Sequence, residues 1–231
     1  MFRSLQKPQY GKESIKKMPS RKHKRLITEG LKDLRKLAKK YYISYGKKIV
    51  IGAGDTKYKG WVSTNRTELD VTNPYDFKKY WRNASVNAFL AEHVWEHLTF
   101  EEALKANANC YAYLVNGGSL RIAVPDGFHP ETSYINGVKP GGTALGSKDH
   151  KILYDYRKMS KCLEEVGFHI ELLEYWDESG NFIMTEWDND RGFIARSSRY
   201  DRRNISGTLK FTSLIVDAIK PDNPWTVWNK A

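Results

Sequence analysis

Histidine and aspartate side chains are concentrated at and beyond residue 126, in a stretch rich in glycine and proline that runs to residue 150. The stretch has no clear hydrophobic period, so we predict a long functional loop. An imidazole has an unperturbed pKa of about 6.5, which suits it to general acid–base catalysis near neutral pH. The loop therefore offers groups for substrate contact and proton transfer, and the alternative for each histidine is an ordinary hydrogen-bonded loop residue. These candidates are Asp126, His129, Tyr134, Asp149 and His150.

The sequence HVWEH at residues 93–97 matches the H-x-x-E-H pattern of one class of zinc peptidases. That chemistry needs both histidines on one continuous helix, with the glutamate as base. Here a buried strand is predicted to end just before His93, and a helix to begin at Thr99, so the segment is predicted to be a strand-to-helix turn. We therefore predict no metal site, and the alternative role for these histidines is a hydrogen bond that supports the turn.

The segment IGAGDTKYKGW (51–61) is a candidate ligand-binding turn. Gly52 and Gly54 carry no Cβ, so backbone amides can approach a ligand closely there. A dinucleotide fingerprint, G-x-G-x-x-G, would need glycine at position 57, which is Lys57. A simple tight turn is therefore the alternative.

Strands and helices alternate from residue 46 onward and must position these groups. Strands are predicted at 47–54, 60–65, 86–92, 119–126, 168–176 and 209–220, and helices at 99–114 and 154–166. Thr99 and Glu102 form a capping box at the start of the first helix. The alternation predicts a mostly parallel sheet with helices on both faces. Ligands of open α/β sheets bind at the carboxyl ends of the strands, so the candidate groups are expected at one edge.

The composition favours a folded enzyme-sized domain. The chain has 231 residues, of which 40% are hydrophobic, enough for one domain with a sizeable core. No apolar run approaches the roughly 18–20 residues of a membrane-spanning helix. Cys110 and Cys162 form no C-x-x-C pair, which excludes a disulfide scaffold and a cysteine-rich zinc site. We expect a cytoplasmic protein.

The positive charge lies at the N-terminus. The net charge is +11, and residues 1–48 hold 16 of the 38 basic side chains but only three of the 27 acidic ones. We predict a flexible basic arm over 1–25 and a single domain over 26–231, which opens with an amphipathic helix at 26–45 that packs on it. The arm is suited to contact phosphates or an anionic membrane, with a solvated tail as the alternative. A second basic cluster, suited to an anionic substrate group or to a solvated surface loop, comprises Arg196, Arg199, Arg202 and Arg203.

Five short motifs in order resemble the small class I S-adenosylmethionine-dependent methyltransferases of the type 11-like group. They are Gly52-Ala53-Gly54, Gly60-Trp61, the run from His93 to Leu98, Gly117-Gly118 and Val124-Pro125-Asp126. The resemblance covers about residues 46–220. In that family the His-x-x-Glu-His-Leu motif follows the fourth strand, and the Gly-Gly pair precedes the fifth. It implies a Rossmann-like, mostly parallel seven-stranded sheet with an antiparallel last strand, and S-adenosyl-L-methionine as cofactor.

The resemblance also implies where the cofactor lies. The turn Gly52, Ala53 and Gly54 would lie against it, with Glu92 and His93 beside its methionine portion. Many such enzymes hold the cofactor ribose with an acidic residue, but the matching position here is Asn65, which accepts hydrogen bonds without charge assistance. Asp70 and Glu68 are the alternatives for that role. The resemblance also implies that His97 lines the substrate side. If the acceptor is a hydroxyl, the candidate general bases are His129 and His150. Asp126 or Asp149 would orient that histidine or act as the base in its place.

Three functions follow from the sequence. The favoured one is methyl transfer to a sugar or glycan hydroxyl, an acceptor class suggested by relatives of the family. The second is methylation of a nucleic acid that the basic arm holds. The third is a cofactor-binding domain without catalysis, for which Asn65 is the motivation. The oligomeric state stays undetermined.

Overall fold

The computed structural model describes residues 21–45, 47–204 and 209–222. The chain divides into two compact units, Met1–Lys39 and Lys40–Ala231. The predicted arm lies outside the described residues up to position 20. Helix α1 (Arg21–Tyr45) begins five residues before its predicted start. Its described side chains from 28 to 42 are exposed, and Ile43 is buried.

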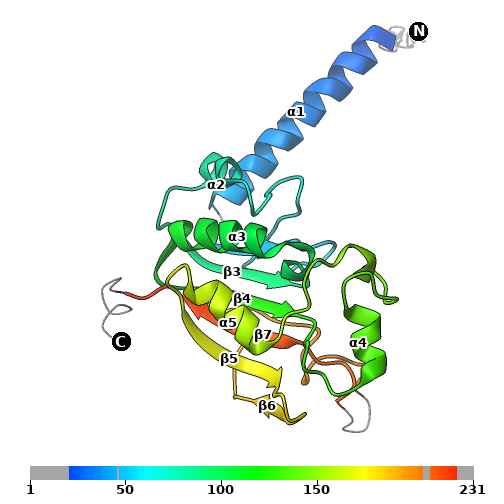
Figure 1. Cartoon of the computed structure of the whole chain (residues 1–231). Coiled ribbons are helices and arrows are strands. Elements are labelled where there is room, and N and C mark those ends of the chain that lie inside the picture. The colour runs from blue at the N-terminus through cyan, green and yellow to red at the C-terminus, as the bar shows by residue number, and fades with distance from the viewer. Residues whose placement is uncertain (1–20, 46, 205–208, 223–231) are drawn as a thin grey trace, which may run out of the picture. The chain divides into compact units, whose positions relative to one another are not determined.

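One seven-stranded sheet organises the second unit (Figure 1). Its order is β2-β1-β3-β4-β7-β5-β6, and β2, β1, β3 and β4 are parallel. Strand β7 is antiparallel to β4 and to β5, and β6 is antiparallel to β5. The strands are β1 (Lys48–Ile51), β2 (Val62–Ser63), β3 (Val86–Glu92), β4 (Leu114–Val124), β5 (His169–Trp176), β6 (Phe182–Met184) and β7 (Leu214–Ile219). The predicted Rossmann-like α/β sheet with an antiparallel last strand is confirmed.

The helices of this unit begin at recognisable signals. The predicted capping box is present, because Thr99 Oγ1 accepts from Glu102 N at 3.2 Å and Glu102 Oε2 accepts from Thr99 N at 2.8 Å. Asn73 caps α2, whose first residue is Pro74. The helices are α2 (Pro74–Tyr80), α3 (Phe100–Tyr113), α4 (Thr132–Val138) and α5 (Tyr156–Glu164), with 3₁₀ turns η1 (Trp95–His97) and η2 (Ser147–Asp149).

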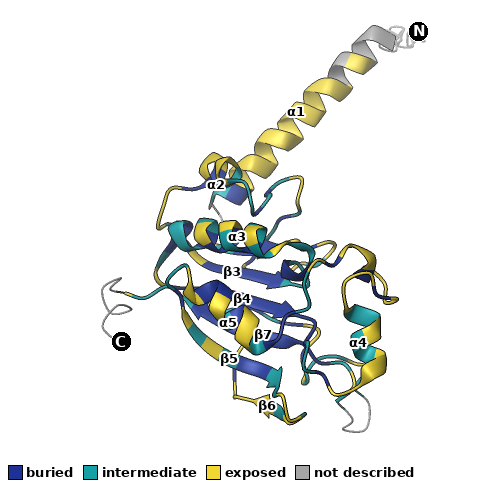
Figure 2. Cartoon of the chain, viewed as in Figure 1, coloured by how far each residue is buried: buried dark blue, intermediate teal, exposed yellow. Residues whose placement is uncertain are grey.

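The two faces of the sheet are covered differently. Residues of α2, α3 and α5 pack in one hydrophobic core against alternate strand residues such as Phe89 and Ile122. Figure 1 shows α3 and α5 on this side of the sheet, and Figure 2 shows how deeply β3, β4 and β7 are buried. The opposite face has a smaller core, with Trp61, Trp187 and Ile194 packed on Leu90 and its neighbours. Helices were predicted on both faces. Among the described residues, α2, α3 and α5 cover the first face, and side chains from outside the helices cover the second.

Three further differences between the predicted and the observed structure concern the segments that connect the strands. The predicted loop over 127–150 contains α4 and η2. Residues 66–85 contain α2 and no strand. The His-x-x-Glu-His-Leu motif therefore follows the third strand of this chain, whereas the resemblance implied the fourth. Gly117 and Gly118 lie inside β4, where they pair with the backbone of Lys220. A Cβ on Gly118 would lie 2.8 Å from the Val115 carbonyl oxygen, which explains why glycine is needed there.

None of the helices in the described part of the chain combines the length and apolar character that crossing a lipid bilayer requires.

Candidate active site

The carboxyl ends of β1, β2, β3 and β4 meet at one edge of the sheet, because these strands are parallel. The residues that follow them are Gly52–Gly54, Asn65, His93 and Asp126. Helix α4 lies beyond the ends of β3 and β4 (Figure 1). The fold thus brings the predicted cofactor and substrate residues to the edge where open α/β sheets bind ligands.

The glycine turn after β1 has the backbone that only glycine adopts easily. Gly52 and Gly54 have φ angles of 62° and 56°. A Cβ on Gly52 would lie 2.5 Å from Val94 Cγ2, whereas a Cβ on Gly54 would meet no atom within 4 Å. Ala53, between them, is buried. Gly52 is therefore required by packing, and the space over Gly54 is open to a ligand.

Asn65 holds this turn from the end of β2. Its Oδ1 accepts from Gly54 N at 2.8 Å, and its Nδ2 donates to the Gly54 carbonyl oxygen at 3.3 Å. The Asn65 N–H donates to Glu68 Oε2 at 2.9 Å. Of the three predicted ribose-binding candidates, Asn65 is therefore the one bonded directly to the glycine turn.

Asp70 is occupied in its own turn. Its Oδ1 accepts from both the amide and the hydroxyl of Thr72, at 3.0 and 2.7 Å. Burial alone would raise the pKa of Asp70, but these hydrogen bonds and the nearby Arg66 hold it below its usual value. Asp70 is therefore an ionised group that stabilises the turn before α2.

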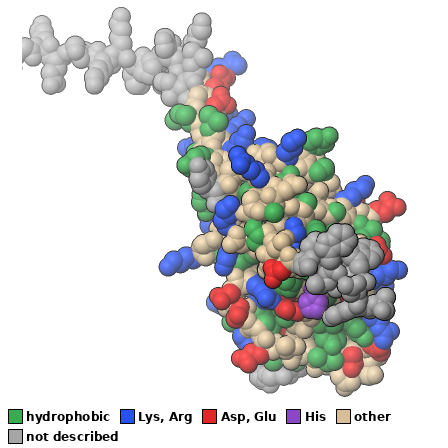
Figure 3. Space-filling model, turned by 90° about the vertical axis from the view of Figure 1, so that its left-hand side faces the viewer, with side chains coloured by type: hydrophobic (Ala, Val, Ile, Leu, Met, Phe, Trp, Pro, Cys, Tyr) green, Lys and Arg blue, Asp and Glu red, His purple; other side chains and the backbone are tan. Residues whose placement is uncertain are grey.

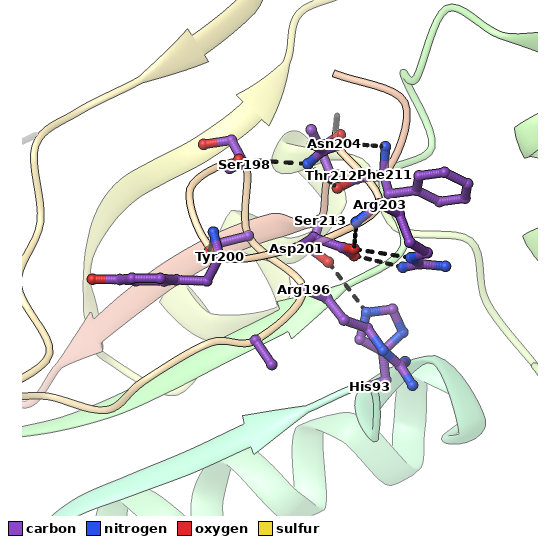
Figure 4. Close-up of polar contacts among 12 residues, drawn as sticks. His93, Arg196, Ser198, Tyr200, Asp201, Arg203, Asn204, Phe211, Thr212 and Ser213 are labelled. Atoms are coloured by element: carbon purple, nitrogen blue, oxygen red, sulfur yellow. Dashed lines mark hydrogen bonds and ion pairs between the residues drawn. The ribbon is translucent and has the colours of Figure 1, made fainter. Parts of the chain in front are cut away.

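Glu92 and His93 bind a segment far along the chain, and Figure 4 shows His93 beside Ser213 of this segment. Glu92 accepts from the backbone amides of Ala195 and Arg196, at 3.2 and 2.8 Å. His93 has a φ of 55°, a strained value for a residue with a Cβ, and its Nε2 lies 3.2 Å from Ser213 Oγ. Together these contacts bring Ala195, Arg196 and Ser213 to the edge of the sheet. No pattern in the sequence indicates Glu92 as the anchor of a segment about a hundred residues away.

Asp126 ties β4 to β5. It is fully buried, with Oδ1 accepting from Phe128 N at 2.9 Å and Oδ2 from Trp176 N at 2.7 Å. Burial raises the pKa of Asp126 to about 6, although the two backbone hydrogen bonds oppose the rise. This carboxylate is a positioning group, because both oxygens already hold the backbone.

His129 is also enclosed. Its Nδ1 accepts from Glu131 N at 3.2 Å, and its ring stacks on Tyr134 with centroids 4.0 Å apart. The Tyr134 hydroxyl donates to the Thr212 carbonyl oxygen at 3.1 Å. Burial lowers the pKa of His129, so the imidazole is neutral near pH 7.

The other predicted candidates form a second group around η1 and η2. His97 Nδ1 lies 3.1 Å from Asp149 Oδ2, and the rings of His97 and His150 are 4.7 Å apart, edge to face. The side chain of Asp149 is 70% exposed and that of His97 31%, whereas His150 is buried. This group, unlike Asp126 and His129, is open to a substrate. The HVWEH segment forms a 3₁₀ turn before α3, so it is not the continuous helix that the peptidase pattern requires.

Two arginines of the predicted cluster, Arg199 and Arg203, are engaged within the chain. Arg203 bonds Asp201 through Nε and Nη2, at 2.9 and 2.6 Å, and its guanidinium lies over the Phe211 ring. Arg199 lies over Trp187 and Tyr200. On the face of the molecule in Figure 3, basic and acidic side chains are interspersed over the body.

A cavity of about 470 Å³ lies elsewhere, against the middle of β5 and β7. Its wall includes the buried ion pair in which Arg121 Nε and Nη2 donate to Asp217, at 2.7 and 2.8 Å. Arg191 also reaches Asp217, at 3.3 Å. This cavity does not include the glycine turn, and the charged residues in its wall form a structural network of ion pairs.

No protein-family model matches the sequence, and no curated protein matches it. The solved structures that resemble it include methyltransferases. A SAM-dependent methyltransferase from Archaeoglobus fulgidus is 17% identical, with a TM-score of 0.43, over 81% of this chain and 92% of that one. A SAM-dependent methyltransferase from Thermotoga maritima, a possible histamine N-methyltransferase, is 9% identical, with a TM-score of 0.47, over 79% and 88%. Phosphoethanolamine N-methyltransferase 2 from Haemonchus contortus, in complex with S-adenosyl-L-methionine, is 11% identical, with a TM-score of 0.37. That match covers 56% of this chain, which spans about a third (35%) of the length of the nematode protein.

Proposed function

We propose that this protein is an S-adenosylmethionine-dependent methyltransferase. The observation that carries the proposal is the glycine turn at the carboxyl end of the parallel strands, with open space over Gly54 and the ordered motifs of the class I family around it. Gly52–Gly54 and Asn65 would line the cofactor, and Glu92 and His93 would lie at its methionine end. S-Adenosylmethionine supplies an electrophilic methyl group when bound.

The polar residues at this edge fit such a ligand. Two carboxylate oxygens offer about four acceptor positions in all, and Glu92 uses two of them for Ala195 and Arg196. Asn65 retains one lone pair and one N–H beyond its bonds to Gly54. Both residues can therefore bind hydroxyl or amino groups without releasing their own backbone partners.

We propose a hydroxyl of a sugar or glycan as the acceptor. Methyl transfer is an in-line displacement, so catalysis depends mainly on holding the acceptor oxygen close to the methyl carbon. The accessible cluster of His97, Asp149 and His150 would receive the acceptor, and its imidazoles are suited to take the hydroxyl proton. Half-buried aromatic rings at the ends of β4 and β5 support a carbohydrate ligand, since amphipathic rings bind surfaces that are partly apolar. They are Phe128, Tyr156, Trp176 and Phe182.

The test of cofactor binding is a calorimetric titration with S-adenosylhomocysteine of the wild-type chain and of Gly54→Val. The valine would fill the open space over the turn, so we expect binding to be lost. Gly141→Val is the matched control, because Gly141 also has a positive φ, 70°, and open space around its missing Cβ. Both variants carry the same backbone strain, and only Gly54→Val changes the site. Equal affinity in the two folded variants would remove the glycine turn from the cofactor site.

A screen of acceptors with labelled cofactor tests the reaction. Transfer to a glycan hydroxyl is the expected result. Transfer to nucleic acid, weakened by salt and by removal of the basic arm, would support the second function instead. Cofactor binding without transfer to any acceptor would support a binding domain.

A further inference from the structure

Glu96 is a buried carboxylate that accepts no hydrogen bond from the described residues. It is 1% exposed, and neither Oε1 nor Oε2 has a hydrogen-bond donor among the described residues. His93 Nδ1 lies 3.1 Å from Glu96 Oε1, but the pair lacks the geometry of a hydrogen bond. An unpaired carboxylate is costly to bury, so buried charges are normally paired or bound to a metal.

Two histidines face this carboxylate. One donor atom from each of Glu96, His97 and His150 lies within 4.8 Å of the other two. His150 Nε2 is 4.0 Å from Glu96 Oε1. His97 Nδ1 is buried and has no hydrogen-bond partner in the part of the chain that the structure describes, although Asp149 Oδ2 is 3.1 Å away.

The backbone around the cluster keeps these groups in place. His150 Nδ1 lies 2.6 Å from the Val138 carbonyl oxygen, which only accepts hydrogen bonds, so Nδ1 carries a proton and the neutral form of the ring has its free lone pair on Nε2. Such a backbone partner is typical of a histidine that binds a metal through its other nitrogen. The Lys151 amide donates to the Glu96 carbonyl oxygen at 2.7 Å, which fastens the His150 segment to η1.

We propose that Glu96, His97 and His150 form a binding site for a divalent first-row transition-metal ion, with Asp149 as a further oxygen donor. Ligand atoms at about 2.0–2.2 Å from an ion lie roughly 3–4 Å from one another, so shifts on the order of 1 Å close the observed cluster around one. Two imidazoles and a carboxylate suit Mn²⁺, Fe²⁺, Co²⁺ or Zn²⁺, whereas Mg²⁺ and Ca²⁺ prefer oxygen ligands alone. The ion would supply the positive charge that balances the carboxylate of Glu96. With His97 and His150 bound to the ion, the proton of a hydroxyl acceptor would pass to the exposed carboxylate of Asp149, the predicted alternative base.

The sequence predicted no metal site in this segment. The H-x-x-E-H pattern would need His93 and His97 as paired ligands on one continuous helix, and the segment forms the 3₁₀ turn η1 instead. The structure replaces His93 with His150, which is 53 residues further along and has no sequence signal linking it to Glu96.

The experiment is a calorimetric titration of the chelator-treated full chain with Mn²⁺, Co²⁺ and Zn²⁺, and with Mg²⁺ and Ca²⁺ for comparison. We expect about one transition-metal ion per chain and weaker binding of Mg²⁺ and Ca²⁺. Glu96→Gln and His150→Ala should each lose affinity by more than the roughly 10–100-fold that loss of an outer-shell partner costs. His169→Ala is the matched control, because His169 is exposed at the start of β5.

Thermal denaturation separates binding from folding. The ion should raise the melting temperature of the wild type and of His169→Ala, because it binds only the folded state. The ion should not change the melting temperature of Glu96→Gln. This variant keeps the shape of the side chain but has no carboxylate to bind the ion. A folded wild type that binds none of these ions would overturn the proposal, as would unchanged affinity in both site variants. Neither measurement uses the cofactor or an acceptor, so the result is independent of the proposed methyl transfer.

Discussion

The buried carboxylate of Asp126 makes the stability of the protein depend on pH in a predictable way. Burial raises its pKa from 3.8 to about 6. A carboxyl group whose pKa is raised on folding stabilises the folded state fully below its unfolded value, and that contribution is lost as the pH rises through the folded value. The shift corresponds to roughly 3 kcal/mol, lost mainly between pH 4 and pH 6.

Asp126→Asn isolates this effect. Urea denaturation of both proteins between pH 4 and pH 7.5 gives the free energy of unfolding at each pH, and the wild type should lose roughly 3 kcal/mol relative to the variant. Asparagine cannot accept from both Phe128 N and Trp176 N through oxygen, so the variant also has a constant penalty of about 1–3 kcal/mol, which does not affect the slope.

Asp177→Asn is the matched control, because folding shifts the pKa of Asp177 in the opposite direction to that of Asp126. Asp177 is partly exposed, and hydrogen bonds from Asn181 lower its pKa, so its contribution is lost only as the pH falls below the usual range for aspartate. A difference between wild type and Asp126→Asn that stays flat from pH 4 to pH 7 would refute the reasoning. It would mean that water reaches the carboxylate, and that Asp126 is open to a substrate after all.

Three other predictions concern the frame of the site. Thr99→Ala removes the capping box of α3 and should lower the free energy of unfolding by about 1 kcal/mol in urea denaturation, whereas Thr132→Ala, in the first turn of the exposed α4, should have little effect. Arg121→Met leaves the buried Asp217 without its main partner and should cost about 3–5 kcal/mol, against about 1 kcal/mol or less for the exposed pair cut by Arg66→Met. Deletion of residues 1–25 should leave the melting temperature nearly unchanged, because this basic segment has no apolar period with which to join a core; a fall of several degrees would contradict this.

The main helices and every strand except β6 were predictable because their signals are local. The buried run at 86–92 matches β3, and the capping box located α3 to within a residue. Helix α2 also had a local signal, Asn73 before Pro74, but its seven residues lie in a polar stretch without a hydrophobic period. Helix α4 buries no residue and contains Gly137, so neither periodicity nor composition indicated it.

The candidate site was predictable in its location but not in its contacts. The parallel order of β1, β3 and β4 follows from the alternation of elements, and it places the following residues at one edge. The bonds that give each residue its role join distant segments: Glu92 to Arg196, Asp126 to Trp176 and Glu96 to the His150 segment. A sequence pattern contains no information on such pairs, because each partner looks like an ordinary loop residue.

These distant bonds have a consequence for how the proposed cofactor would bind. Glu92 is held by two backbone amides and Asn65 by the glycine turn, so both side chains are ordered before a ligand arrives. Binding to a preformed site avoids the ordering cost of about 0.5–1.5 kcal/mol for each flexible side chain. Asn65 lacks the charge that strengthens a hydrogen bond to a ribose hydroxyl, and its preorganisation offsets part of that loss. The same asparagine could not be exchanged for aspartate without loss, because aspartate has no N–H for the Gly54 carbonyl oxygen. The departure from the acidic residue of the family is therefore coupled to the geometry of this particular turn.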